Sequence, residues 1–132
     1  METLKLRSET AIKALKTLEE IVEEPYSTIV RDASIKRFEY SFDIFWKFIK
    51  DYLRVQEGIE CASPKSCYRE AFKVGILSEE ETAKVLEMAD DRNLSTHTYN
   101  EEAIEEIYQR VRDYWKLMDN ICVRIIESSI NH

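Results

Sequence analysis

Residues 92–99 bring together side chains that could do chemistry on a phosphodiester. They read Arg92, Asn93, Leu94, Ser95, Thr96, His97, Thr98 and Tyr99. An arginine guanidinium stays charged and can stabilise negative charge on phosphorus, while a histidine imidazole can take the proton from a ribose 2′-hydroxyl. Cleavage of a phosphodiester without a metal requires such a pair. The Arg-x-x-x-x-His spacing alone is weak support, because arginine is frequent in this chain.

Other interpretations of these residues stay open. Arg92 could form an ion pair with Asp90 or Glu87, and the imidazole of His97 could find its hydrogen-bond partners at a helix cap. A metal site would need His97 together with Asp90, Asp91 or a cysteine, and no such ligand spacing is present. We therefore expect no metal and no cofactor. Adjacent glutamates occur along the chain, but they are typical of solvated helix faces rather than of acid–base pairs.

Amphipathic helices must position these residues. The first is predicted over about residues 3–24, and the second from a cap at Ser27 or Thr28 to Gly58. The second helix has apolar residues in steps of three and four, namely Ile35, Phe38, Phe42, Phe45, Ile49 and Tyr52. A short helix should begin at Ser63 and Pro64 and run to about residue 74, and a further helix should follow the capping box at Ser78.

The junction before the last helix decides how the candidate residues meet. A second capping box, Thr98 to Glu101, predicts that His97 lies just before the last helix, or in its first turn if Asn100 is not the cap. Arg92 and His97 would then converge across a helix–helix junction, whereas on one helix they would point about 140° apart. Tyr99 falls off the apolar seam of the last helix, so we expect its hydroxyl to be accessible to solvent.

Composition sets the fold class. The chain has 132 residues, of which 44% are hydrophobic, with only two glycines and two prolines. This is enough to build a core, and it leaves too few turn residues for a β-rich domain. We predict an all-α, antiparallel up-and-down helical bundle of about four to five helices, forming a single domain over residues 1–132.

Charge and cysteine usage narrow the function classes. A net charge of −7 argues against coating nucleic acid by bulk attraction, so no DNA substrate is expected, although a local RNA site stays open. Cys61, Cys67 and Cys122 form no Cys-x-x-Cys pair and are odd in number, so we expect free thiols in a reducing cytosol. No apolar stretch reaches the roughly 18 residues of a membrane span and no signal peptide is evident, so a cytoplasmic protein without membrane association is expected. His132 ends the chain and is expected to be poorly ordered.

Three blocks of this sequence resemble HEPN domains of the branch that pairs with minimal nucleotidyltransferases. Residues 92–99 match that family's signature of an arginine, a polar residue, three further residues, a histidine, any residue and a tyrosine. Residues 36–47 look like the family's second helix, and residues 67–77 look like the segment leading to its catalytic helix. The resemblance covers about residues 4–126 and implies a helical bundle.

The resemblance implies a toxin of a two-gene toxin–antitoxin pair. Such a toxin is a metal-independent RNase with Arg92, Asn93 and His97 as catalytic residues, and it acts as a homodimer with both subunits contributing to one cleft. Its partner is a minimal nucleotidyltransferase antitoxin, which in some members adds AMP to the tyrosine corresponding to Tyr99. Older descriptions of the family imply the alternative, a non-catalytic subunit that binds substrate for a nucleotidyltransferase.

Overall fold

The computed structural model describes residues 2–130, and every regular element in this range is helical. Five α-helices follow one another: α1 (Glu2–Val22), α2 (Thr28–Glu57), α3 (Pro64–Lys73), α4 (Glu79–His97) and α5 (Glu101–Ile125). A π-helical turn, Ile126–Ile130, continues α5. The prediction of an all-α bundle of four to five helices is confirmed. His132 lies outside the described residues.

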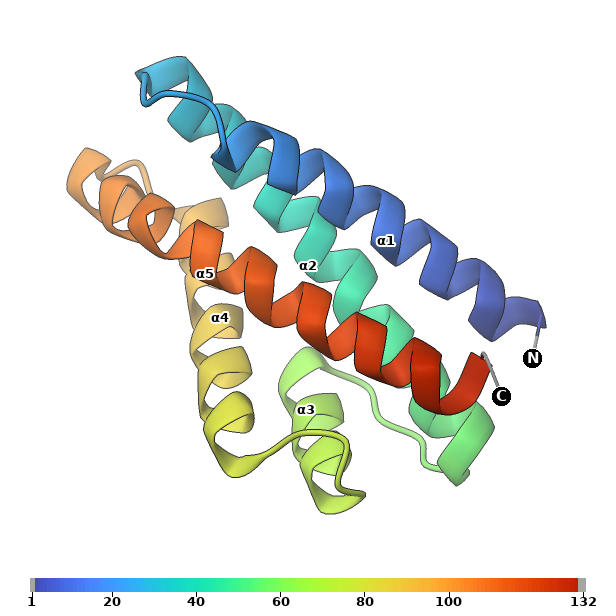
Figure 1. Cartoon of the computed structure of the whole chain (residues 1–132). Helices are drawn as coiled ribbons and strands as arrows, with labels where there is room; N and C mark the ends of the chain where they lie inside the picture. The colour runs from blue at the N-terminus through green and yellow to red at the C-terminus, as the bar shows by residue number, and fades with distance from the viewer. Residues whose placement is uncertain (1, 131–132) are drawn as a thin grey trace.

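The helices form an up-and-down bundle (Figure 1). In this view α1, α2 and α5 lie side by side, and α1 runs opposite to α2. The pair α3 and α4 carries the chain back beside α2 and α5. As a result α5 begins at the end of the bundle where α2 begins, and Tyr26 just before α2 donates a hydrogen bond of 2.7 Å to Glu105 of α5.

Capping residues explain the helix boundaries. Ser27, Ser63, Ser78 and Asn100 each accept a hydrogen bond from a backbone N–H in the first turn of the helix that follows. Gly58 ends α2 in a left-handed conformation with φ of 67°, as the sequence predicts. α1 ends at Val22, two residues earlier than the prediction of about residue 24.

The core is one continuous cluster to which all five α-helices contribute. The predicted apolar stripe of α2 is buried, and its aromatic rings contact those of other helices. Phe38 stacks on Tyr114 of α5 at 5.5 Å between ring centroids, and Phe42 meets Tyr68 of α3 edge-on at 6.4 Å. Each large apolar side chain buried in this way contributes about 1.5–3 kcal/mol. None of the described helices is long and apolar enough to cross a membrane.

The cysteine prediction was wrong for two of the three residues. Cys61 and Cys67 form a disulfide, with 5.3 Å between their Cα atoms. Pro64 starts α3 directly after the connecting loop, and the first turn of this helix brings Cys67 back beside the loop residue Cys61. Neither an odd cysteine count nor the lack of a Cys-x-x-Cys spacing excludes that approach. Cys122 is free and buried, and burial raises the pKa of its thiol well above the usual value.

Candidate active site

The end of α4 carries the residues that the sequence singled out, but not in the predicted arrangement. α4 continues without a break to His97, Thr98 is extended, and Asn100 caps α5. Arg92 and His97 therefore belong to one helix rather than to two sides of a junction. At 100° per residue they point about 140° apart, so they do not converge within this chain. Arg92 faces α2, whereas Asn93 and His97 are exposed.

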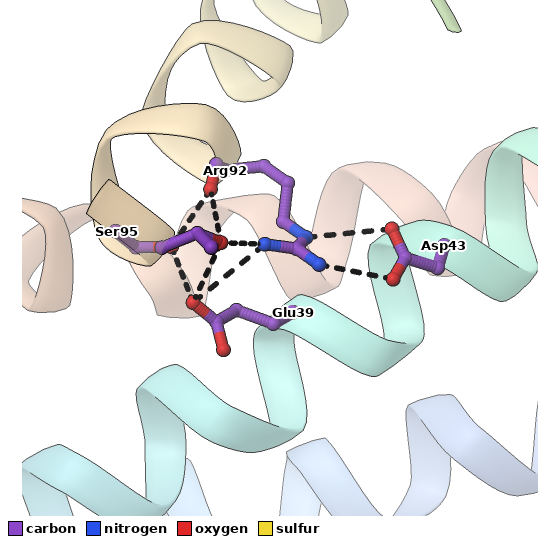
Figure 2. Close-up of polar contacts among 5 residues, drawn as sticks. Glu39, Asp43, Arg92 and Ser95 are labelled. Carbon is purple, nitrogen blue, oxygen red and sulfur yellow. Dashed lines mark hydrogen bonds and ion pairs between the residues drawn. The ribbon is translucent and has the colours of Figure 1, made fainter.

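Arg92 is held by carboxylates of α2 (Figure 2). Its Nε and Nη2 donate to the two carboxylate oxygens of Asp43 at 3.3 and 3.0 Å, which is a bidentate pairing. Its Nη1 lies 3.7 Å from Glu39 Oε2 and contacts the hydroxyl of Thr96. The side chain is 21% exposed, so the guanidinium is fixed in orientation yet can still be reached from solvent.

Glu39 joins the same cluster through α4. Its Oε2 lies 2.7 Å from the Ser95 hydroxyl, which is buried, and 3.4 Å from the hydroxyl of Thr96. Asp43 and Glu39 stand one turn apart on α2, and Arg92 and Ser95 one turn apart on α4, so the two helices meet through matched polar residues. The result is a rigid polar contact at the edge of the core.

Arg92 therefore pairs with carboxylates of α2 and not with Asp90 or Glu87, the partners considered from the sequence. Asp90 instead pairs with Lys65 of α3 at 2.6 Å, and Glu87 lies 3.9 Å from Arg110 of α5. On a helix, residues two or five positions from Arg92 point to other sides, which explains this outcome. The only sequence signal for the true partners is the spacing of two carboxylates, four residues apart, off the apolar stripe of α2.

Tyr99 lies in the short extended connection between α4 and α5. Its side chain is 99% exposed, which confirms the prediction of an accessible hydroxyl. Thr98 and Asn100 on either side have extended backbones, and the Asn100 N–H donates to Thr98 Oγ1 at 3.1 Å. The tyrosine is therefore presented to solvent two residues beyond His97 by a connection whose two ends are fixed.

Ion pairs fix the two helices on either side of that connection. Asp91 of α4 is 6% exposed and accepts two hydrogen bonds from Arg110 of α5, at 2.7 and 2.9 Å, and one from the Tyr114 hydroxyl. Burial and this carboxylate raise the pKa of Tyr114 well above its usual value. At the start of α5, Glu101 pairs at 2.8 Å with Arg31, a buried residue of α2.

A groove of about 670 Å³ lies between α4 and α5. Arg92, Asn93, His97 and Tyr99 are not among its lining residues. Both arginines that line it are already paired, Arg124 with Glu81 at 2.8 Å and Arg110 with Asp91. The candidate residues thus stand at the end of α4, outside this concave surface.

Fold and site together define a class of protein. It is a helical bundle in which one helix carries an arginine and a histidine near its end, with an exposed tyrosine just beyond it. Residues 6–126 match the family described as nucleotidyltransferase substrate binding protein like, and the chain belongs to that family. A protein of Haemophilus influenzae named probable ribonuclease HepT is 26% identical over 95 residues. That alignment covers 66% of this chain and only 64% of the relative.

Solved structures of other proteins share this fold. A crystal structure of a protein from Thermus thermophilus is 48% identical, with a TM-score of 0.84, over 87% of this chain and 98% of that one. A tri-AMPylated HEPN toxin of Shewanella oneidensis, solved in complex with MNT antitoxin, has a TM-score of 0.79 over 98% of this chain and 99% of that one. It is only 11% identical, so this likeness shows the shared fold alone.

Proposed function

We propose that this protein is a metal-independent RNase toxin of a HEPN and minimal-nucleotidyltransferase pair, acting in the cytoplasm as a homodimer. The observation that carries the proposal is the fixed guanidinium of Arg92 on the same exposed helix end as Asn93 and His97. A distant relative named as a probable ribonuclease supports it. Membership of the nucleotidyltransferase substrate-binding family does not depend on this proposal.

The proposed reaction is an attack by a ribose 2′-hydroxyl on the neighbouring phosphorus. His97 takes the proton of that hydroxyl, the new O2′–P bond forms, and the P–O5′ bond breaks. Arg92 stabilises the charge on the phosphoryl oxygens, and Asn93 is an additional donor. The leaving 5′-oxygen takes up a proton, so the products are a 2′,3′-cyclic phosphate and a 5′-hydroxyl. No metal takes part in these steps.

Two chains supply the site in this proposal. Because Arg92 and His97 point about 140° apart on α4, one chain does not bring both to one phosphate. A two-fold axis near the end of α4 would bring Arg92 of one subunit opposite His97 of the other. The same symmetry gives the dimer a second, equivalent site, in which the two subunits exchange these roles.

Expression of the chain alone tests the toxin proposal. We expect growth arrest with the unaltered chain and its loss with His97→Ala and with Arg92→Ala. Arg69→Ala removes an exposed arginine of α3 and is the matched control, which should still arrest growth. All four chains must accumulate to similar levels. Unimpaired growth with the unaltered chain, or arrest that persists in His97→Ala, would count against the proposal.

Regulation is proposed to act at Tyr99. The nucleotidyltransferase partner would transfer AMP from ATP, forming a bond between the Tyr99 phenolic oxygen and the α-phosphorus while pyrophosphate leaves and the phenolic proton passes to a base of the partner. The added phosphate would lie two residues from His97, where it repels RNA by charge and blocks it by bulk. The 99% exposure of Tyr99 supports access by the partner.

We expect Tyr99→Phe to stay toxic and to escape control by the partner and ATP. Phenylalanine keeps the ring but removes the oxygen that receives the nucleotide, and the exposed position makes structural damage small. Mass spectrometry of the unaltered chain after incubation with partner and ATP should find the added AMP on Tyr99. An unmodified Tyr99 with activity still suppressed would mean that the partner inhibits by binding alone.

A second candidate is a non-catalytic subunit that binds substrate for a nucleotidyltransferase. The observation that favours it is the pairing of Arg92 with Asp43 and Glu39, which occupies the guanidinium with carboxylates of its own chain. Under this alternative the chain would increase the activity of the partner and would leave RNA intact. Growth arrest and RNA cleavage by the chain alone separate the two candidates.

A further inference from the structure

One face of α2 next to Arg92 combines an aromatic ring with lysines. At 100° per residue, positions 36, 39, 43, 46, 47 and 50 fall within an arc of about 100°. Glu39 and Asp43 of this arc contact Arg92 on α4, so the arc borders the candidate site (Figure 2). Trp46 follows Asp43 by three residues, which is about 4.5 Å along the helix axis.

Trp46 is only partly buried, although its ring is the largest aromatic system available in a protein. The ammonium group of Lys50 lies over this ring, 5.8 Å from its centroid. Trp46 packs against the core, which holds its ring in place. The flexible Lys50 side chain covers one face of this ring and can move aside to a phosphate when a base stacks there. Lys47, one position further, is exposed.

The charge on this face is opposite to that of the whole chain. Lys36, Lys47 and Lys50 add three positive charges, and Glu39 and Asp43 are balanced in part by Arg92, in a chain whose net charge is −7. A surface with lysines around a partly exposed aromatic ring fits single-stranded nucleic acid, because phosphates pair with the lysines and a base stacks on the ring.

We propose that Trp46, Lys47 and Lys50 form a subsite for single-stranded RNA beside the phosphate that Arg92 contacts. A base next to the cleaved bond stacks on Trp46, and the two lysines pair with flanking phosphates. This inference rests on the proposed RNase function and adds the residues that hold the substrate strand. Because stacking accepts every base, the subsite gives affinity for unpaired RNA rather than a strict sequence.

Tryptophan fluorescence tests the subsite directly. The chain has two tryptophans, so Trp115→Phe leaves Trp46 as the one reporter. In a Trp115→Phe, His97→Ala chain, which binds RNA without cleaving it, oligouridylate should quench the fluorescence in a saturable way. Without His97→Ala, cleavage by the Trp115→Phe chain should match that of the unaltered chain. Adding Lys50→Gln should weaken binding and lower its salt dependence, with a slope smaller by about 0.7.

The pair Trp46→Phe and Trp46→Ala separates stacking from folding. In a His97→Ala chain, Trp46→Ala should weaken RNA binding by about five- to a hundred-fold, measured by anisotropy of labelled RNA, whereas Trp46→Phe should stay within about three-fold. Circular dichroism checks that each variant is helical. If Trp46→Ala does not fold, the quenching titration of the Trp115→Phe, His97→Ala chain still decides.

The outcomes distinguish this inference from the function on which it rests. RNA cleavage without quenching of Trp46, and with an unchanged affinity in Trp46→Ala, would overturn the subsite and leave the RNase proposal standing. Saturable quenching without cleavage would support the subsite and contradict the RNase. Equal quenching by polyglutamate, which carries charge but no bases, would overturn the stacking proposal. Binding of single-stranded DNA equal to that of RNA would overturn the assignment of RNA as the ligand.

Discussion

The ion pair between Arg92 and Asp43 has two consequences for a guanidinium that is proposed to act on phosphate. It fixes the plane and direction of the guanidinium, because both Nε and Nη2 are bound to one carboxylate. It also sets a negative charge beside the position that an RNA phosphate would take. The first effect helps catalysis and the second weakens substrate binding, so the two effects should separate in kinetics.

Asp43→Asn separates them. The amide has almost the same shape but accepts only one of the two N–H groups, so we expect kcat for RNA cleavage to fall about tenfold while KM stays equal or decreases. Steady-state kinetics on a labelled oligoribonucleotide measures both constants. Asp90→Asn is the matched control, since Asp90 is an exposed carboxylate of α4 that pairs with Lys65. An unchanged kcat in Asp43→Asn would show that Asp43 does not position Arg92.

Among single residues, only part of the site could be predicted from the sequence. The exposure of Tyr99 was predictable, because its place off the apolar seam depends on local spacing alone. The Asp43 and Glu39 partners of Arg92 were not. They are 49 and 53 positions away, and which face of α2 meets α4 depends on how the whole core packs.

At the scale of elements, helix boundaries follow local chemistry and were largely predictable. Ser78, Gly58 and Pro64 each act over one turn, and the boundaries they set are observed. The junction after Arg92 was harder, because Thr98 and Asn100 both have capping side chains and only one can cap α5. Asn100 does so, which agrees with the prediction that His97 precedes the last helix, but α4 continues as far as His97. His97 is therefore the last residue of the helix that carries Arg92, and the predicted convergence does not occur.

The start of α4 is fixed by an acidic residue with a lowered pKa. Glu81 completes the capping box with Ser78 and pairs with Arg124 at 2.8 Å, and hydrogen bonding to Arg124 is the main cause of the lower pKa. A carboxyl whose pKa is lower in the folded than in the unfolded chain stabilises the fold above the unfolded pKa. This contribution is lost as the pH falls through the folded pKa.

Glu81→Gln should therefore destabilise the protein at pH 7 by about 1–2 kcal/mol. The difference from the unaltered chain should shrink as the pH falls below about 4.5, where the unfolded chain takes up this proton, and it should disappear at the lower pH at which Glu81 is protonated in the folded chain as well. Urea unfolding at several pH values measures it. Glu80→Gln is the control, because Glu80 forms a surface pair with Lys84 and should matter by less than about 0.5 kcal/mol. A difference that does not depend on pH would contradict this assignment.

At the scale of the whole molecule, composition and periodicity predicted the fold class because they reflect the total apolar area and its spacing. Every residue of the predicted apolar stripe of α2 is buried. Because the core is one continuous cluster, we propose that residues 1–132 form a single domain. Sequence patterns do not encode the Cys61–Cys67 disulfide. They also do not encode how two copies of the chain would contact each other in the proposed dimer.

The proposed dimer makes a prediction that involves the whole assembly. Light scattering at micromolar concentration should give roughly 31 kDa, twice the 15.7 kDa of one chain. If each site takes Arg92 from one subunit and His97 from the other, then mixing Arg92→Ala and His97→Ala chains should restore about a quarter of the activity, because half of the dimers carry one intact site. A monomer, or mixed chains that stay inactive, would contradict the shared site.

The most direct test of the central claim is cleavage of RNA by the purified chain in excess EDTA. We expect fragments that end in a 2′,3′-cyclic phosphate and a 5′-hydroxyl, a loss of at least about a hundredfold in His97→Ala and in Arg92→Ala, and a smaller loss in Asn93→Ala. Arg69→Ala should cleave like the unaltered chain. Cleavage that requires added Mg²⁺, or that persists in His97→Ala, would contradict the account.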